Sequence, residues 1–352
     1  MNKRVLLCGY FAFGTDDYGG QPVKGRALYN GLRAKYGAEN VHFIETANWK
    51  KHPFRLLMRF FWQAKKYDKI IMLPAHNGLI VFSRLLKLVK HFYHKDIYYA
   101  VVGGWLPDKV KESRSLLKTL QAFNGIWVET TSMKKNLDKL GFHNVVVVPN
   151  FKDIIPLKEN EVIEKFEKPY PVLTFARIME EKGTEDAINA VREINDIAGE
   201  IVITLDLYGQ IYEPYRDRFE KLQGEFPEYI NYRGIVNSEK SVDTLKNYYA
   251  LLFPTHFYTE GVPGTLIDAL CAGVPVITSL WGNSSDIFKQ DVTGWGYEFG
   301  KSNMLKEFLL KAIQEPERFL LMRKKSLKEA KKFSPQSIIE QIDDLLYSKE
   351  GA

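Results

Sequence analysis

The residues best suited to chemistry lie in one short segment, residues 260–268, with the sequence EGVPGTLID. It places two carboxylates, Glu260 and Asp268, eight residues apart around a Gly/Pro loop. The pattern after Gly264 predicts a helix that ends at Gly273. A helix start offers unpaired N–H groups and a positive dipole end to a phosphate, whereas carboxylates accept from hydroxyls or bind cations. The segment therefore predicts a ligand that carries both a diphosphate and free hydroxyls, such as a nucleotide sugar.

The elements that must position this segment alternate along the whole chain. Apolar, β-rich runs are separated by amphipathic segments of helical length, and this alternation is typical of parallel sheets covered on both faces. The expected strands cover residues 4–10, 41–45, 69–73, 97–102, 125–129, 145–148, 172–175, 201–208, 230–232, 250–253 and 274–278. The pattern predicts an α/β protein made of two Rossmann-like domains.

The domain boundaries follow from breaks in this pattern. Residues 1–150 form the first expected domain, residues 151–168 a charged linker, and residues 169–333 the second domain. Ser334 and Pro335 are suited to cap and begin a final helix within residues 334–352, which we expect to pack back on the first domain.

The overall composition excludes several protein classes. At 352 residues and 45% hydrophobic content, the chain is long enough for two folded domains. Its two cysteines, Cys8 and Cys271, fall in an expected strand and an expected helix, which argues against a disulfide framework and favours a reducing compartment. No run of 18 or more apolar residues predicts a membrane span. We therefore expect a cytoplasmic protein, with peripheral attachment to the inner face of the membrane as a further option.

The segment around Glu260 resembles the Glu-x7-Glu signature of the retaining glycosyltransferases of family GT4, and the resemblance covers nearly the whole chain. It implies a GT-B fold, in which two Rossmann-like parallel-sheet domains face each other across a cleft. It also implies that Glu260 contacts the donor sugar and that Asp268 binds the nucleotide ribose. The loop that holds sugar and phosphate would comprise Val262, Pro263, Gly264, Thr265 and Leu266.

This chain departs from the family pattern at two places. The second acid is Asp268, one methylene shorter than Glu, and Val262-Pro263 replaces the common Phe-Gly. An Asp still accepts two ribose hydroxyls if the helix begins slightly closer to the ligand, so we expect the function to be retained with adjusted geometry. A simpler role for Asp268, as an acid favoured by the helix dipole, is the alternative.

A second constellation, Arg177 and Lys182, follows the expected strand at residues 172–175. Arg offers a planar fork and Lys a compact point charge, and both would neutralise a diphosphate at the carboxyl end of a strand, where open α/β sheets bind ligands. The pair resembles the Arg…Lys-Gly element of the family, so Arg177, Lys182 and Glu260 are the predicted catalytic residues. No His/Cys cluster or strand-flanked Asp-x-Asp is present, and we expect metal-independent transfer from a UDP- or GDP-sugar without a further cofactor.

Glycine-rich loops supply the remaining candidates. Gly19 and Gly20 follow the first strand and permit close approach of the backbone to a ligand. The resemblance to family GT4 implies that such a pair lies opposite the donor phosphate; a plain tight turn is the alternative. They do not form the Gly-x-Gly-x-x-Gly fingerprint of a dehydrogenase. By resemblance, three residues contribute backbone contacts to the base and phosphate: Gly209, Gly234 and Ile235.

The acceptor side has weaker candidates, all in the first domain. They are His76, Gly103, Gly104 and Trp105. Many members of family GT4 carry a histidine after the strand that here ends in Gly103-Gly104. Its absence leaves one donor-sugar contact unassigned.

Charge is divided unevenly between the two halves. Residues 1–150 contain 24 Lys and Arg against 10 Asp and Glu, whereas residues 151–352 contain 25 against 33.

Over residues 51–66, a helix would place four apolar side chains on a face expected to pack on the core: Phe54, Leu57, Met58 and Phe61. The other face would carry Trp62 among four cations: Lys51, Arg55, Arg59 and Lys66. A solvated basic face and an anionic membrane surface are both consistent with this pattern; no nucleic-acid-binding motif accompanies it.

Together these features predict a retaining glycosyltransferase. It would move a sugar from a nucleotide diphosphate sugar to a hydroxyl of a glycan or lipid-linked glycan, as in the synthesis of a surface polysaccharide. One alternative is a catalytically weak GT-B subunit that binds a nucleotide sugar beside a partner transferase. A nucleotide-sugar epimerase is a further alternative, but it needs additional carboxylates that the sequence does not identify.

Overall fold

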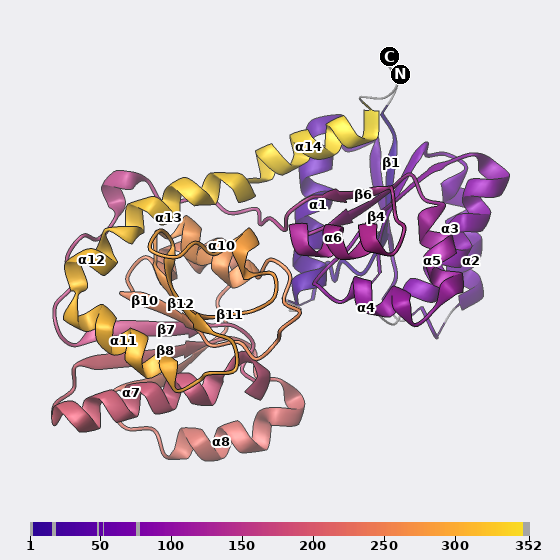
Figure 1. Cartoon of the computed structure of the whole chain (residues 1–352). Helices are drawn as coiled ribbons and strands as arrows, with labels where there is room; N and C mark the ends of the chain where they lie inside the picture. Colours follow the sequence, from indigo (N-terminus) through magenta and orange to yellow (C-terminus); the bar gives the residue numbers. More distant parts are fainter. Residues whose placement is uncertain (1–2, 16–18, 48, 52, 75–77, 348–352) are drawn as a thin grey trace. The chain divides into compact units, whose positions relative to one another are not determined.

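The computed structural model describes residues 3–15, 19–47, 49–51, 53–74 and 78–347, without the side chain of Arg55. The chain forms two compact units (Figure 1). The first comprises Met1–Lys152 and Phe333–Ala352, and the second comprises Asp153–Lys332. The two units are the two Rossmann-like domains that the sequence predicts.

The first unit contains a parallel six-stranded sheet of order β2-β1-β3-β4-β5-β6. The strands are β1 (Val5–Gly9), β2 (Val41–Glu45), β3 (Lys69–Leu73), β4 (Asp96–Ala100), β5 (Gly125–Val128) and β6 (Val145–Val147). In the register of the central strands, Val5 pairs with Val41 on one side and Lys69 on the other. Every strand agrees with a sequence prediction to within two residues at each end.

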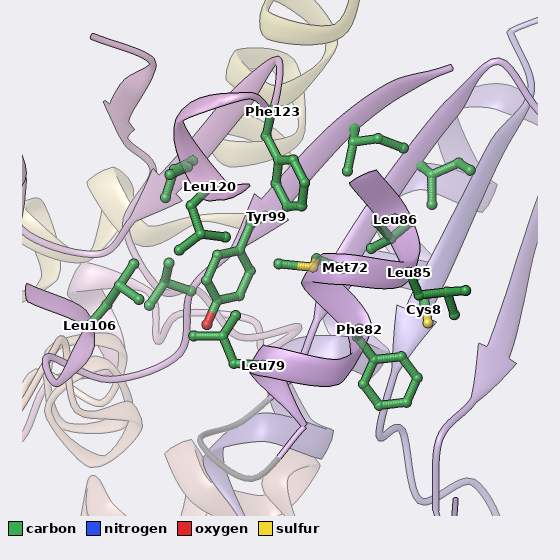
Figure 2. Close-up of a cluster of buried hydrophobic side chains, with 14 of the residues drawn as sticks. Cys8, Met72, Leu79, Phe82, Leu85, Leu86, Tyr99, Leu106, Leu120 and Phe123 are labelled. Atoms are coloured by element: carbon green, nitrogen blue, oxygen red, sulfur yellow. The ribbon is translucent and has the colours of Figure 1, made fainter. Parts of the chain in front are cut away.

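Helices cover both faces of this sheet, which explains why its inner strands β1, β3 and β5 are almost entirely apolar. One face packs on α1 (Gly20–Tyr36) and α14 (Pro335–Tyr347). The other packs on α2 (Pro53–Ala64), α3 (Leu79–Tyr93), α4 (Leu106–Lys111), α5 (Arg114–Gln121) and α6 (Thr131–Lys139). Figure 2 shows Leu79, Phe82, Leu85 and Leu86 of α3 in the core beside Cys8 and Met72 of the sheet.

Helix α14 completes the first unit, although it comes last in the chain. The Ser334 hydroxyl accepts from the Ser337 amide at 3.3 Å, the capping contact that the sequence predicts. The side-chain amide of Gln341 donates to the Val147 carbonyl at 2.7 Å, and Asp343 accepts from the Tyr36 hydroxyl at 2.7 Å. Burial and this contact with Asp343 raise the pKa of Tyr36, so the phenol stays protonated.

The second unit contains a parallel six-stranded sheet of order β12-β11-β10-β7-β8-β9. The strands are β7 (Tyr170–Phe175), β8 (Ile203–Tyr208), β9 (Ile230–Gly234), β10 (Ala250–Phe253), β11 (Val276–Leu280) and β12 (Gly294–Glu298). The helices are α7 (Thr184–Ala198), α8 (Arg216–Gly224), α9 (Ser241–Leu245), α10 (Gly264–Cys271), α11 (Met304–Gln314), α12 (Pro316–Leu320) and α13 (Met322–Ala330).

The segment predicted as a linker packs closely on the second unit. The Leu157 amide donates to the Cys271 carbonyl at 2.8 Å, and Glu164 forms an ion pair with Lys324 of α13. Ile154, Leu157 and Val162 are buried. Residues 153–168 therefore belong to the packed body of this unit.

The predicted packing face of the helix at residues 51–66 is wrong. Phe54 and Met58 are 81% and 73% exposed, and Leu57 is also exposed, whereas Phe60 and Ala64 are completely buried. Of the four residues expected to face the core, only Phe61 packs against it. The helix carries more apolar residues than the core accepts, so hydrophobic periodicity alone selects the wrong side.

Candidate functional site

The predicted donor-binding residues gather at the carboxyl edge of the second sheet. Arg177 follows the end of β7, Gly209 follows β8, Gly234 ends β9, and the loop that contains Glu260 follows β10. Backbone hydrogen bonds join these loops, since the Gly209 amide donates to the Gly234 carbonyl at 2.9 Å. This edge is the usual ligand site of open parallel sheets.

The centre of the site is an ion pair between Lys182 and Glu260. Lys182 ends a short 3₁₀ turn after β7, and Glu260 comes from the loop before α10, so two distant segments meet here. The Lys182 ammonium also lies 5.0 Å from the ring centre of Phe257, and both members of the pair are largely shielded from water. Such a pair can hold an anion and a hydroxyl group side by side.

The Glu260 loop is anchored by residues that the sequence patterns do not identify. The side-chain amide of Asn283 donates to the Glu260 carbonyl at 2.6 Å, and the Thr255 hydroxyl lies 3.3 Å from the Glu260 carboxylate. Asn283 follows β11 and Thr255 follows β10, so both also lie at the carboxyl edge of the sheet. That position is the one sequence signal that could have marked them.

Glycine at position 183 fixes the place of Lys182. Gly183 has a φ of 71° and joins the 3₁₀ turn to α7. A Cβ on Gly183 would lie 2.1 Å from the carbonyl oxygen of Pro254, a contact that no side chain tolerates. The turn is therefore pressed against the residue that follows β10, and it holds Lys182 beside the Glu260 loop.

Helix α10 begins at the loop as the sequence predicts. Pro263 precedes its first residue, Gly264, and supplies no side-chain cap. The Leu266 and Ile267 amides donate to the Pro263 carbonyl, so the available donors of this first turn are the Gly264 and Thr265 amides. The side chains of Val262 and Leu266 are buried, and contact of these residues with a donor stays a prediction. Among the described residues, the buried Thr265 hydroxyl has no hydrogen-bond partner.

Asp268 lies inside α10 and is only 1% exposed. Its carboxylate accepts from the Ser241 hydroxyl of α9 at 2.8 Å. In this arrangement Asp268 ties α9 to α10. Contact between Asp268 and a ribose stays a prediction, since a ligand would have to approach a carboxylate that is already packed.

A polar network lies beside the predicted base loop at Gly234. Asp206 accepts from Arg233 at 2.9 Å and from the Tyr248 hydroxyl at 2.6 Å. Burial and the hydrogen bond to Asp206 raise the pKa of Tyr248, which keeps its phenol neutral. The network braces the end of β9, where Gly234 adopts a positive φ and Ile235 is exposed.

The first unit holds the other predicted residues. Gly19 precedes α1 and Gly20 is its first residue; a Cβ on Gly20 would have no neighbour within 4 Å, so packing does not require glycine there. Trp105 follows Gly103 and Gly104, and its indole donates to the Val102 carbonyl at 2.8 Å, turning the ring back onto its own loop. His76 lies outside the described residues. Roles for these residues toward donor or acceptor stay predictions.

Known proteins resemble this chain in sequence and in fold. It is 24% identical to the amylovoran biosynthesis glycosyltransferase AmsK of Erwinia amylovora over 273 residues, 68% of this chain and 67% of that protein. It is 26% identical to a 2-deoxystreptamine N-acetyl-D-glucosaminyltransferase of Niallia circulans over 329 residues, 92% and 79% of the two chains.

Among solved structures, HepE of Anabaena in complex with UDP and glucose matches with a TM-score of 0.75 at 13% identity. The match covers 98% of this chain and 100% of that one, and it confirms the GT-B fold class. The family model described as "Glycosyl transferases group 1" matches residues 157–346, which include the whole site at the carboxyl edge of the second sheet. This chain belongs to the family of group 1 glycosyl transferases.

Proposed function

We propose that this glycosyltransferase is a retaining enzyme that transfers a sugar from a UDP- or GDP-sugar to a hydroxyl of a glycan or lipid-linked glycan. The observation that carries the proposal is the ion pair between Lys182 and Glu260 beside the start of α10. Within a few side chains, the site offers a carboxylate for sugar hydroxyls, a cation for phosphate and helix amides for a second phosphate oxygen.

Lys182 connects the two ends of the proposed donor site. Its ammonium has three protons, so it can keep Glu260 as one partner and bind a phosphate oxygen with another. Lys182 would then couple the charge of the leaving diphosphate electrostatically to Glu260, the carboxylate that binds the sugar. Arg177, exposed after β7, adds a planar fork for the same phosphates.

The proposed reaction needs no protein nucleophile. The acceptor hydroxyl attacks the anomeric carbon from the face that the diphosphate leaves, the bond from carbon to phosphate oxygen breaks, and the hydroxyl proton passes to a phosphate oxygen. Negative charge grows on the diphosphate as the bond breaks. Lys182, Arg177 and the first amides of α10 stabilise that charge, and the fixed positions of these groups reduce the reorganisation required.

Incubation with a panel of UDP- and GDP-sugars tests this function. We expect one donor to raise the apparent Tm by mass action and to release its nucleoside diphosphate when a hydroxyl acceptor is added. The product should keep the anomeric configuration of the donor by NMR, and activity should survive EDTA because protein cations neutralise the diphosphate. Donor binding without any turnover would instead support a non-catalytic subunit, and an isomerised donor would indicate an epimerase.

Replacement of Arg177 with Ala should lower turnover by about 100-fold and leave the apparent Tm unchanged. The side chain is exposed, so its loss affects the proposed diphosphate contact and little else. Arg177→Lys should recover only part of the rate, because an ammonium cannot form the paired hydrogen bonds of a guanidinium. Arg192→Ala removes a half-buried Arg of α7, in the same unit, that donates to the Glu225 carbonyl; as the control it should retain full activity. Equal rates for Arg177→Ala and the wild type would show that Arg177 does not contribute to the proposed diphosphate site.

A further inference from the structure

A row of exposed apolar side chains runs along α2 of the first unit. Phe54, Met58 and Trp62 are 81%, 73% and 62% exposed and occur four residues apart, so they share one side of the helix. The opposite side packs on the core through Phe60 and Ala64. The exposed row spans about 12 Å along the helix and takes no part in the core of this unit.

Helix α3 extends the same kind of surface. The two helices pack together, with Phe61 of α2 and Tyr93 of α3 in edge contact at 6.3 Å between ring centres (Figure 1). Leu88 and Phe92 of α3 are exposed, while its inward residues fill the core shown in Figure 2. Of the seventeen large apolar side chains exposed among the described residues, eight lie on these two helices. We call the exposed side chains of α2 and α3 the apolar ridge.

Cations surround the apolar ridge. Neither helix carries an Asp or Glu. Residues 50–95 contain eleven Lys and Arg and one acidic residue, Asp68, which pairs with Lys95; Lys69 is buried in β3 and pairs with Asp96. Arg59, Lys66 and Arg84 are exposed, and the Lys66 ammonium lies 3.6 Å from the ring centre of Trp62. Apolar side chains beside an aromatic residue and a cationic rim are the composition of a helix that lies in a membrane interface.

We infer that the apolar ridge is a membrane-docking surface, which inserts Phe54, Met58 and Trp62 among lipid chains while the surrounding cations bind anionic headgroups. None of the helices in the described part of the chain has the length and hydropathy to span a bilayer, so the proposed attachment is interfacial. Phe54 and Met58, which the sequence pattern placed toward the core, thus face the proposed membrane.

Charge selects the bilayer over other occupants. A second copy of the chain, docked symmetrically, would bring two cationic rims together, and like charges at close range oppose association. A nucleic acid would satisfy the cations but would leave Met58 and Leu57 against a polar backbone. In an anionic bilayer, the apolar side chains of the ridge can enter the lipid chains while the surrounding cations contact the negatively charged headgroups.

Flotation of the full chain with vesicles tests the inference. Wild-type protein should float with vesicles of phosphatidylcholine and phosphatidylglycerol, and the fluorescence of Trp62 should shift to the blue, a change absent from Trp62→Phe. Phe54→Ser/Met58→Ser/Trp62→Ser should reduce the partition coefficient by at least about 100-fold. Arg59→Glu/Lys66→Glu/Arg84→Glu should lose binding to anionic vesicles, and high salt should weaken wild-type binding.

The chain supplies a matched control for the loss of exposed apolar area. Ile155→Ser/Ile197→Ser/Leu321→Ser removes three exposed apolar side chains of the second unit and should float like wild type. All variants should bind and hydrolyse a donor sugar as wild type does, which separates this inference from the proposed chemistry. Absence of wild-type protein from the floated fraction would overturn it. So would a wild-type dimer that the apolar substitutions convert to a monomer, or a shift of RNA that they abolish.

Discussion

Replacement of Glu260 with Gln should lower the turnover number for sugar transfer by at least about 100-fold without unfolding the protein. Gln keeps the size of the side chain and its contact with Thr255, but it removes the charge that pairs with Lys182. The ammonium of Lys182 would then bind the phosphate without a counter-charge at the sugar. The loss should therefore appear mainly in kcat, measured with saturating donor and acceptor.

A surface ion pair of the same unit supplies the control for this substitution. Glu193 of α7 pairs with Lys306 of α11, and both side chains are substantially exposed. Glu193→Gln makes the same chemical change away from the sheet edge and should leave kcat unchanged. If Glu260→Gln retained a kcat within a few-fold of wild type, Glu260 would be a structural partner of Lys182 and the proposed catalytic site would be wrong.

Replacement of Gly183 with Ala should reduce both stability and activity. The new Cβ would lie 2.1 Å from the Pro254 carbonyl oxygen, and the residue would also have to hold a φ of 71°. Strain and clash together should destabilise the second unit by about 3 kcal/mol or more. For a unit of this size, that loss corresponds to a fall in apparent Tm of about 6 to 12 °C, measurable by calorimetry.

Gly199, at the other end of α7, separates the effect of φ from that of the clash. Its φ is 66°, but a Cβ there would meet no atom within 4 Å. Gly199→Ala should cost about 1 kcal/mol and leave turnover intact. Gly183→Ala should also displace Lys182 and reduce turnover of the folded fraction by at least about tenfold. Similar stabilities for the two variants would show that the turn at Gly183 can move away from Pro254.

The sequence predicted most of the sheet architecture because continuous apolar runs in a parallel sheet carry an unambiguous signal. It missed β12, whose sequence GWGYE has only two aromatic residues, Trp295 and Tyr297, alternating with glycines that disfavour strands. At its first residue, Gly294, a Cβ would lie 1.9 Å from the Val276 carbonyl oxygen, so a close approach between strands determines this residue. Such long-range contacts leave no periodic trace.

The site residues also divide into those with a local sequence signal and those set by long-range contacts. Lys182 and Glu260 belong to local motifs, and the structure brings them together. Asn283 and Ser241 contact the same motifs from segments that have no fixed spacing to them, so their contacts follow only from the folded sheet. The orientation of α2 was missed for a different reason: both of its sides are apolar, and only the core on one side decides which is buried.

The position of α14 in the first unit has a consequence for the order in which the protein is made. Four side chains of one core, Ile338, Ile339, Ile342 and Leu346, are translated about 190 residues after β6, once the whole second unit has been synthesised. Until then, α1 alone covers the face of the first sheet that later receives α14. The second unit can thus finish folding on the ribosome before the first, although synthesis of the first begins earlier. The core of the first unit is complete only when α14 has been synthesised and has packed on it.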